Sequence, residues 1–80
     1  MWIKTGTVIC NTDEFTRFYI EEMPDNSYGV FGKQSEHISI ILGAYRDFNR
    51  AQNAFNNFYS ALERGQNAYM MQESDRIWSL

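Results

Sequence analysis

The spacing of hydrophobic positions changes once along the chain, near its middle. Before this point Ile38, Ile40 and Leu42 alternate with other residues, as in a half-buried strand. After it Phe48 begins a hydrophobic run at helical spacing, which ends before Gly65. The change from period 2 to period 3.6 predicts a sheet followed by one helix.

Local signals set the two ends of that helix. Asp47 stands at the N-cap position, where its carboxylate can accept a hydrogen bond from the first turn. Gly65 stands where a left-handed residue commonly ends a helix, and Arg64 in the last turn complements the helix dipole. The sequence therefore predicts a helix over residues 48–64.

Three longer strands are predicted before the helix, over residues 15–23, 28–33 and 37–45. The first is rich in β-branched and aromatic residues, which favour strands. Pro24 and the polar residues up to Ser27 supply a turn between the first and second strands. Because the connections are short, the three strands are expected to form an antiparallel meander.

Shorter elements are predicted near both ends of the chain. Residues 2–4 and 7–10 are separated by a glycine and predict a short hairpin or a bent strand. Asn11 and Glu14 have the spacing of a capping box, so a single helical turn is expected there. Residues 68–71 predict a closing strand after the helix.

These elements together predict an α+β fold, in which an antiparallel sheet of four or five strands carries one amphipathic helix on one face. Their order is β-β-β-β-α-β. Residues 1–71 form one compact domain, and residues 72–80 form a C-terminal tail that is polar apart from Ile77, Trp78 and Leu80. The predicted core comprises Trp2, Phe18, Ile20, Phe31, Ile38, Ile40, Leu42, Ala51, Phe55, Phe58, Leu62 and Tyr69.

A single helix can cover only one face of such a sheet. If Ile38, Ile40 and Leu42 face the helix, the residues that alternate with them face the other way. Tyrosine combines an apolar ring with a polar tip and is common at interfaces. We therefore expect a partner or self-association face, unless the N-terminal strands or the Trp78 tail fold over it. The residues assigned to this face are Tyr19, Ile41, Tyr45 and Tyr28.

Composition and charge narrow the classes of function. Of the 80 residues, 44% are hydrophobic and 16% aromatic, which argues against disorder. Seven basic and ten acidic residues give a net charge of −3, which argues against nucleic acid as a partner. No apolar run approaches the ~20 residues of a membrane span, and the first residues lack the pattern of a signal peptide. We expect a soluble, cytoplasmic protein with no membrane partner.

No group of residues has the pattern of a catalytic site. His37 is the only histidine and Cys10 the only cysteine, so a zinc site would lack ligands and no disulfide can form within the chain. Cys10 follows two apolar residues and is expected to pack as a small hydrophobe. Glu21 and Glu22 point to opposite faces of a strand, so they cannot act as a pair. We expect no enzyme activity, no metal and no cofactor.

Part of the pattern resembles a group of small, strand-rich proteins from Firmicutes and their phages. The residues that carry the resemblance are Trp2, Ile3, Lys4, Thr5, Leu42, Gly43, Tyr45, Ala51, Phe55, Leu62, Gly65, Tyr69 and Met70. It covers residues 1–71, and the proteins of that group end in one helix and a short strand. Their helix is usually rich in Glu and Lys, whereas the helix here is rich in Asn. The resemblance implies a phage or mobile-element setting and supplies no catalytic motif.

Two hypotheses for function follow. The first is a non-enzymatic protein-interaction module, expected to be a homo-oligomer. In the setting that the resemblance implies, it would be an accessory factor that binds and inhibits a host defence protein. The alternative is an oligomeric protein that binds a small molecule or a nucleotide without catalysis.

Overall fold

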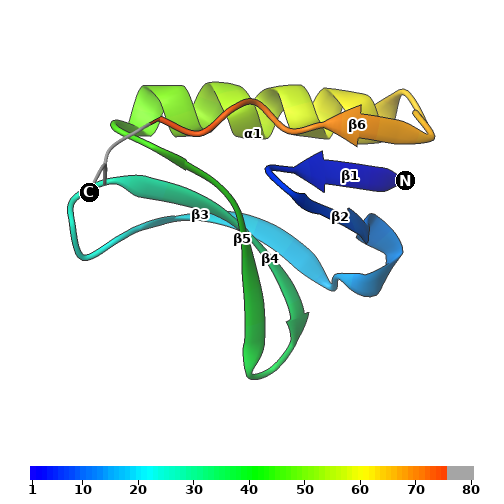
Figure 1. Ribbon diagram of the computed structural model, residues 1–80, viewed down its shortest axis with the longest axis horizontal. Coiled ribbons are helices and arrows are strands. Elements are labelled where there is room, and N and C mark those ends of the chain that lie inside the picture. Colours follow the sequence, from blue (N-terminus) through cyan, green and yellow to red (C-terminus); the bar gives the residue numbers. More distant parts are fainter. Residues whose placement is uncertain (76–80) are drawn as a thin grey trace.

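The computed structural model describes residues 1–75, which form an α+β fold with one helix and two three-stranded sheets (Figure 1). The strand order is β2-β1-β6 in sheet A and β3-β4-β5 in sheet B. The predicted single sheet of four or five strands is thus divided into two. Ile77, Trp78 and Leu80 of the predicted tail lie outside the described residues. The elements are β1 (Trp2–Thr5), β2 (Val8–Asn11), a 3₁₀ turn (Thr12–Glu14), β3 (Arg17–Glu22), β4 (Tyr28–Ser35), β5 (Ile38–Tyr45), α1 (Phe48–Glu63) and β6 (Ala68–Met70).

Sheet B is the predicted antiparallel meander. Its first turn forms as the sequence indicates, because the Ser27 backbone N–H donates to the Asp25 carboxylate at 3.0 Å. Asn26 takes the left-handed conformation with φ 71°, which asparagine tolerates better than most residues. The single helical turn before β3 is also confirmed, and the Asn11 side chain accepts from the Asp13 N–H.

Sheet A joins the two ends of the chain. Its central strand β1 pairs antiparallel with β2 and parallel with β6. Ile3 lies opposite Cys10 and Tyr69 and is fully buried, so it marks the inner face of this sheet. Trp2 must then point outward, and it is 54% exposed. The prediction of Trp2 as a core residue is wrong, because Ile3 is the inward position of β1.

Helix α1 packs on the inner faces of the sheets. It begins at Phe48 as predicted and ends at Glu63, one residue earlier than predicted: the Asp47 carboxylate accepts from the Arg50 N–H at 2.9 Å, and Gly65 has a φ of 70°. Three of its four buried residues are alanines, which let the strands approach the helix closely. The fourth, Phe58, packs edge-on against Phe18 of β3 with ring centroids 4.8 Å apart. The core cluster is Ile3, Val30, Leu42, Tyr45, Ala51, Ala54, Phe58 and Met71.

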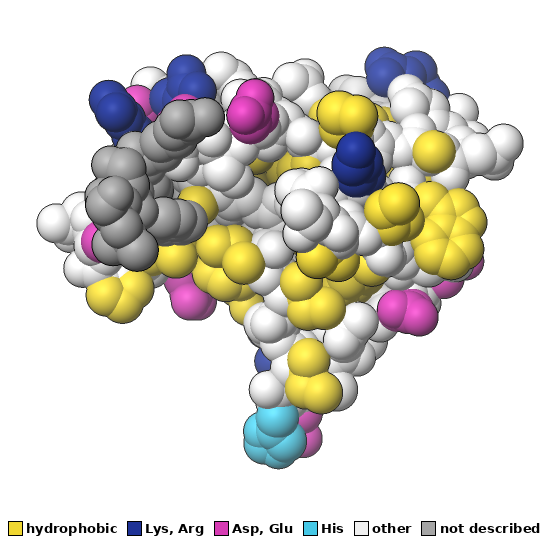
Figure 2. Space-filling model, viewed as in Figure 1, with side chains coloured by type: hydrophobic (Ala, Val, Ile, Leu, Met, Phe, Trp, Pro, Cys, Tyr) yellow, Lys and Arg dark blue, Asp and Glu magenta, His cyan; other side chains and the backbone are white. Residues whose placement is uncertain are grey.

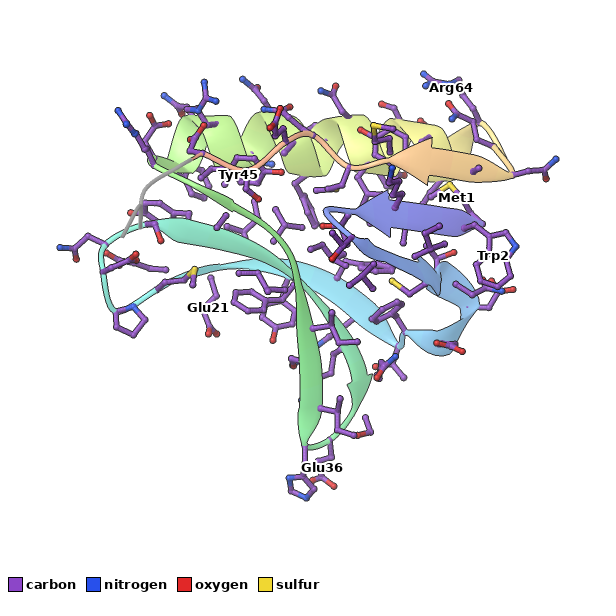
Figure 3. The ribbon with its side chains drawn as sticks, in the orientation of Figure 1. Met1, Trp2, Glu21, Glu36, Tyr45 and Arg64 are labelled. Carbon is purple, nitrogen blue, oxygen red and sulfur yellow. The ribbon has the colours of Figure 1, made fainter. Side chains whose placement is uncertain are left out.

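A β-bulge in β5 changes which residues face the helix. Val30 pairs with Gly43 and Phe31 pairs with Ile41, so Leu42 is an extra residue in β5. Leu42 is buried, and after it the alternation is reversed. Tyr45 consequently enters the core between β5 and α1, where it is fully buried (Figure 3).

Two further core assignments are corrected. Phe31 pairs with Tyr19 on the face of sheet B that points away from the helix, where it is half-buried. Ile38 is 52% exposed, because the end of the β4–β5 hairpin extends beyond the helix (Figure 1). Ile40 and Phe18 pack partly buried against the core, on the helix side of sheet B as expected.

The segment after β6 forms hydrogen bonds with both sheets. The Met71 N–H donates to the Lys4 carbonyl at 2.9 Å, and the Asp75 N–H donates to the Ala44 carbonyl at 2.9 Å. The Arg50 side chain forms a bidentate ion pair with the Asp75 carboxylate. Residues 72–75 therefore run from sheet A to the edge of sheet B.

Replacing Tyr45 with phenylalanine is expected to destabilise the fold by about 1 kcal/mol. The Tyr45 hydroxyl donates to the Gln72 carbonyl at 2.7 Å, and its loss leaves that acceptor without its partner. Urea unfolding of Tyr45→Phe measures the effect. Tyr59→Phe is the matched control, because Tyr59 is 60% exposed and should lose little stability. Equal stability of the two variants would contradict the role given to this hydrogen bond.

Protonation of Asp75 in acid is expected to weaken the attachment of residues 72–75 to sheet B. Hydrogen bonds from Arg50, and then from the Arg46 N–H, hold the pKa of Asp75 below its ordinary value. The stability contributed by Asp75 is therefore present above about pH 4, the unfolded value, and is lost as the pH falls through the lower folded pKa. Urea unfolding should show that wild type exceeds Asp75→Asn in stability at pH 7 and that this difference shrinks as the pH falls below about 4. A difference that persists in acid would contradict this assignment.

Candidate functional site: two outward sheet faces

The outward face of sheet A carries an apolar groove. Trp2, Ile9 and Met70 are 54%, 63% and 68% exposed, although each belongs to a regular strand. The register places Ile9 and Met70 on either side of Lys4, because both pair with it from the neighbouring strands. The groove measures about 330 Å³, and Ala68 and Tyr69 complete its lining. This surface combines several large exposed side chains at one end of the molecule.

Lys4 is the only charged residue among those that line the groove. Figure 2 shows hydrophobic side chains gathered at this end of the molecule around a basic side chain. Lys4 is exposed, and a ligand that covers the groove would take its ammonium out of water, where it attracts a carboxylate or a phosphate more strongly. The groove can therefore bind an apolar group that carries a negative charge.

The outward face of sheet B brings together two of the four residues predicted for a partner face. Tyr19 pairs with Phe31, and Phe31 pairs with Ile41, so the three side chains form one row across the sheet. The Tyr19 and Phe31 rings are stacked with centroids 5.5 Å apart. Ile41 is 40% exposed. Phe31 belongs to this row and was missed, because the sequence pattern placed it in the core.

The other two residues predicted for that face lie on the opposite side of the sheet. The bulge at Leu42 turns Tyr45 into the core, and burial raises its pKa to about 12. Tyr28 pairs with Tyr45 and packs edge-on against Phe48 of the helix, with ring centroids 5.7 Å apart. Neither tyrosine can share a contact surface with Tyr19.

Cys10 and His37, the two residues considered for chemistry, lie in different parts of the fold. Cys10 pairs with the buried Ile3, packs against the core, and has its pKa raised by burial and by the charge of Glu14. A raised pKa keeps the thiol protonated and weakens it as a nucleophile. His37 is exposed in the turn between β4 and β5, at the far end of the hairpin. Within residues 1–75, no three His, Cys, Asp or Glu side chains are grouped so that they could hold a metal ion.

Sequence reasoning also missed Ile9 and Met70. A signal was available in the pairs Val8-Ile9 and Met70-Met71, because two adjacent large residues cannot both face inward on a strand. The parallel pairing of β1 with β6 brings Met70 next to Lys4. This pairing joins residues far apart in the sequence, so no local pattern predicts it.

Comparisons with protein-family models, with curated proteins and with solved structures find no significant match to this chain. In the part of the chain that the structure describes, the helix is too short and too polar to cross a membrane.

Cys10 is expected to react slowly with iodoacetamide in the folded protein. Because its pKa is raised, the thiolate fraction at pH 8 is smaller than in the unfolded chain. Mass spectrometry of alkylation at pH 8, with and without about 8 M urea to unfold the chain, compares the two states. A faster reaction in the folded protein would show an activated thiol and would contradict the structural role of Cys10.

Proposed function

We propose that this protein is a non-enzymatic protein-interaction module that binds its partner through the outward groove of sheet A. The observation that supports it is the exposure of Trp2, Ile9 and Met70 around Lys4. Large apolar side chains grouped on the surface of a small protein mark contact sites more often than chance exposure. Tryptophan and methionine are also enriched at the centres of protein interfaces.

The chemistry of the groove defines the partner surface. It requires apolar side chains to cover Trp2, Ile9 and Met70 and one carboxylate to pair with Lys4. Without that carboxylate, the lysine charge would be buried unpaired, which is costly. The partner is therefore a protein surface or segment in which an Asp or Glu is flanked by apolar residues.

The phage or mobile-element setting implied by the resemblance suggests where this partner comes from. We propose a protein of the host cell, which the module binds and inhibits by covering a surface that the host protein needs. This step rests on the resemblance, whereas the groove supports protein binding by itself.

The test is capture of partners from a host lysate with immobilised wild type and with Ile9→Glu. Burying isoleucine contributes about 1.5–3 kcal/mol, so the substitution should weaken capture by about ten- to a hundredfold. Ile38→Glu is the matched control, because Ile38 has a similar exposure at the far end of the β4–β5 hairpin. Capture that depends on Ile9 and survives Ile38→Glu supports the proposal.

Lys4→Glu supplies a second, independent variant. It reverses the charge in the groove and should abolish binding of a partner that presents a carboxylate. Circular dichroism of each variant checks that the fold is kept. If the same proteins are retained by wild type, Ile9→Glu and Lys4→Glu alike, the groove is not the contact site.

A further inference from the structure

The outward face of sheet B consists of three rows of side chains that differ in character. The register of the three strands defines the rows, since paired residues lie side by side on one face. The first row is basic, the second is apolar, and the third ends in an acid. The rows are Arg17, Lys33 and Ser39; Tyr19, Phe31 and Ile41; and Glu21, Gly29 and Ala44.

The apolar row is held in place by its neighbours. The Tyr19 ring stacks on Phe31, and its hydroxyl donates to the Ser39 hydroxyl oxygen at 3.0 Å. The Arg17 guanidinium lies 5.5 Å from the centroid of the Tyr19 ring. Side chains that are already fixed lose little conformational entropy when a partner covers them.

The two outer rows carry opposite charges at opposite ends of the face. Arg17 and Glu21 are exposed, and Lys33 is half-exposed. Glu21 points away from helix α1, in the direction expected for the outward face (Figure 3). If a second copy of this face is rotated so that its strands run in the opposite direction, its acidic end meets the basic end of the first copy.

We propose that a second copy of this chain docks on the outward face of sheet B, about a two-fold axis that runs along the row Tyr19, Phe31 and Ile41. This axis reverses the strand direction between the two copies. The basic row of each copy then lies over the acidic end of the other, and the apolar rows cover each other. The interface is isologous, as is usual in homodimers.

The charges select this arrangement over the other face-to-face packing. A two-fold axis along the central strand β4 would exchange β3 with β5, so that Arg17 lies over Ser39, Lys33 over its own copy and Glu21 over Ala44. Like charges opposed at a contact cost free energy and disfavour that arrangement. Only the axis along the apolar row places Arg17 directly over Glu21, and Lys33 then lies over Gly29, beside the Glu21 of the other copy.

The size of the face predicts a weak dimer. Three strands spaced about 4.8 Å apart and rows separated by about 7 Å give a patch well below the ~800 Å² per partner of a stable interface. The dimer should therefore dissociate on dilution. Because ion pairs at its rim contribute, it should also weaken as the salt concentration rises.

Sedimentation velocity of the purified protein over a range of concentrations tests the proposal. Wild type should shift reversibly from monomer to dimer, and 1 M salt, with a Debye length of about 3 Å, should reduce the dimer fraction. Glu21→Lys alone and Arg17→Glu with Lys33→Glu should each remain monomeric, because each variant opposes like charges. Glu63→Lys is the control, since it makes the same charge change at the exposed end of α1 and should leave the dimer intact.

An equimolar mixture of Glu21→Lys with the double variant Arg17→Glu, Lys33→Glu tests the charge pairing directly. In the mixed dimer every opposed pair is again of opposite sign, so dimers should return to at least the wild-type fraction. A wild type that stays monomeric at all concentrations overturns the proposal, and so does a dimer that survives both charge variants. This test is independent of the groove on sheet A, because Ile9→Glu should leave the dimer unchanged.

Discussion

The extra residue in β5 links the parts of this fold. Leu42 fills the core as a bulge, and its carbonyl accepts a hydrogen bond from the Thr5 hydroxyl at the end of β1. Sheet A is thereby attached to the middle of β5. The same bulge turns Tyr45 inward, where its hydroxyl binds the segment that follows β6. Two of the connections between the sheets therefore involve the residues that this one irregularity positions.

A single helix shared between two sheets explains why so much apolar surface faces outward. Helix α1 presents one stripe, largely of alanine, and both sheets pack against it and against each other through Ile3, Val30 and Leu42. On the outward face of sheet B, Gly29 and Ala44 are buried, whereas Tyr19, Phe31 and Ile41 keep part of their surface exposed. The outward faces of the two sheets differ in kind: sheet A carries an apolar groove around one lysine, and sheet B carries an apolar row between charges of opposite sign.

Local signals predicted the local structure, and the errors arose where distant segments meet. Asp47 and Gly65 defined the helix because capping depends on residues close in sequence. The meander followed from its short turns. The bulge at Leu42 could not be seen, because it depends on the register between β4 and β5. Tyr45 was consequently assigned to the wrong face, although Tyr19 and Ile41 were correctly placed together.

The parallel pairing of β1 with β6 has a consequence for the order of folding. Trp2 lies opposite Ala68, so sheet A is closed by contacts between the two ends of the chain. Such contacts carry a large loop-closure entropy and slow the folding of a small domain. During synthesis, the meander of sheet B can pair as soon as it leaves the ribosome. The free edge of β1 can pair with β6 only after the helix and β6 have been synthesised, so the surface that carries the groove is completed later than the meander.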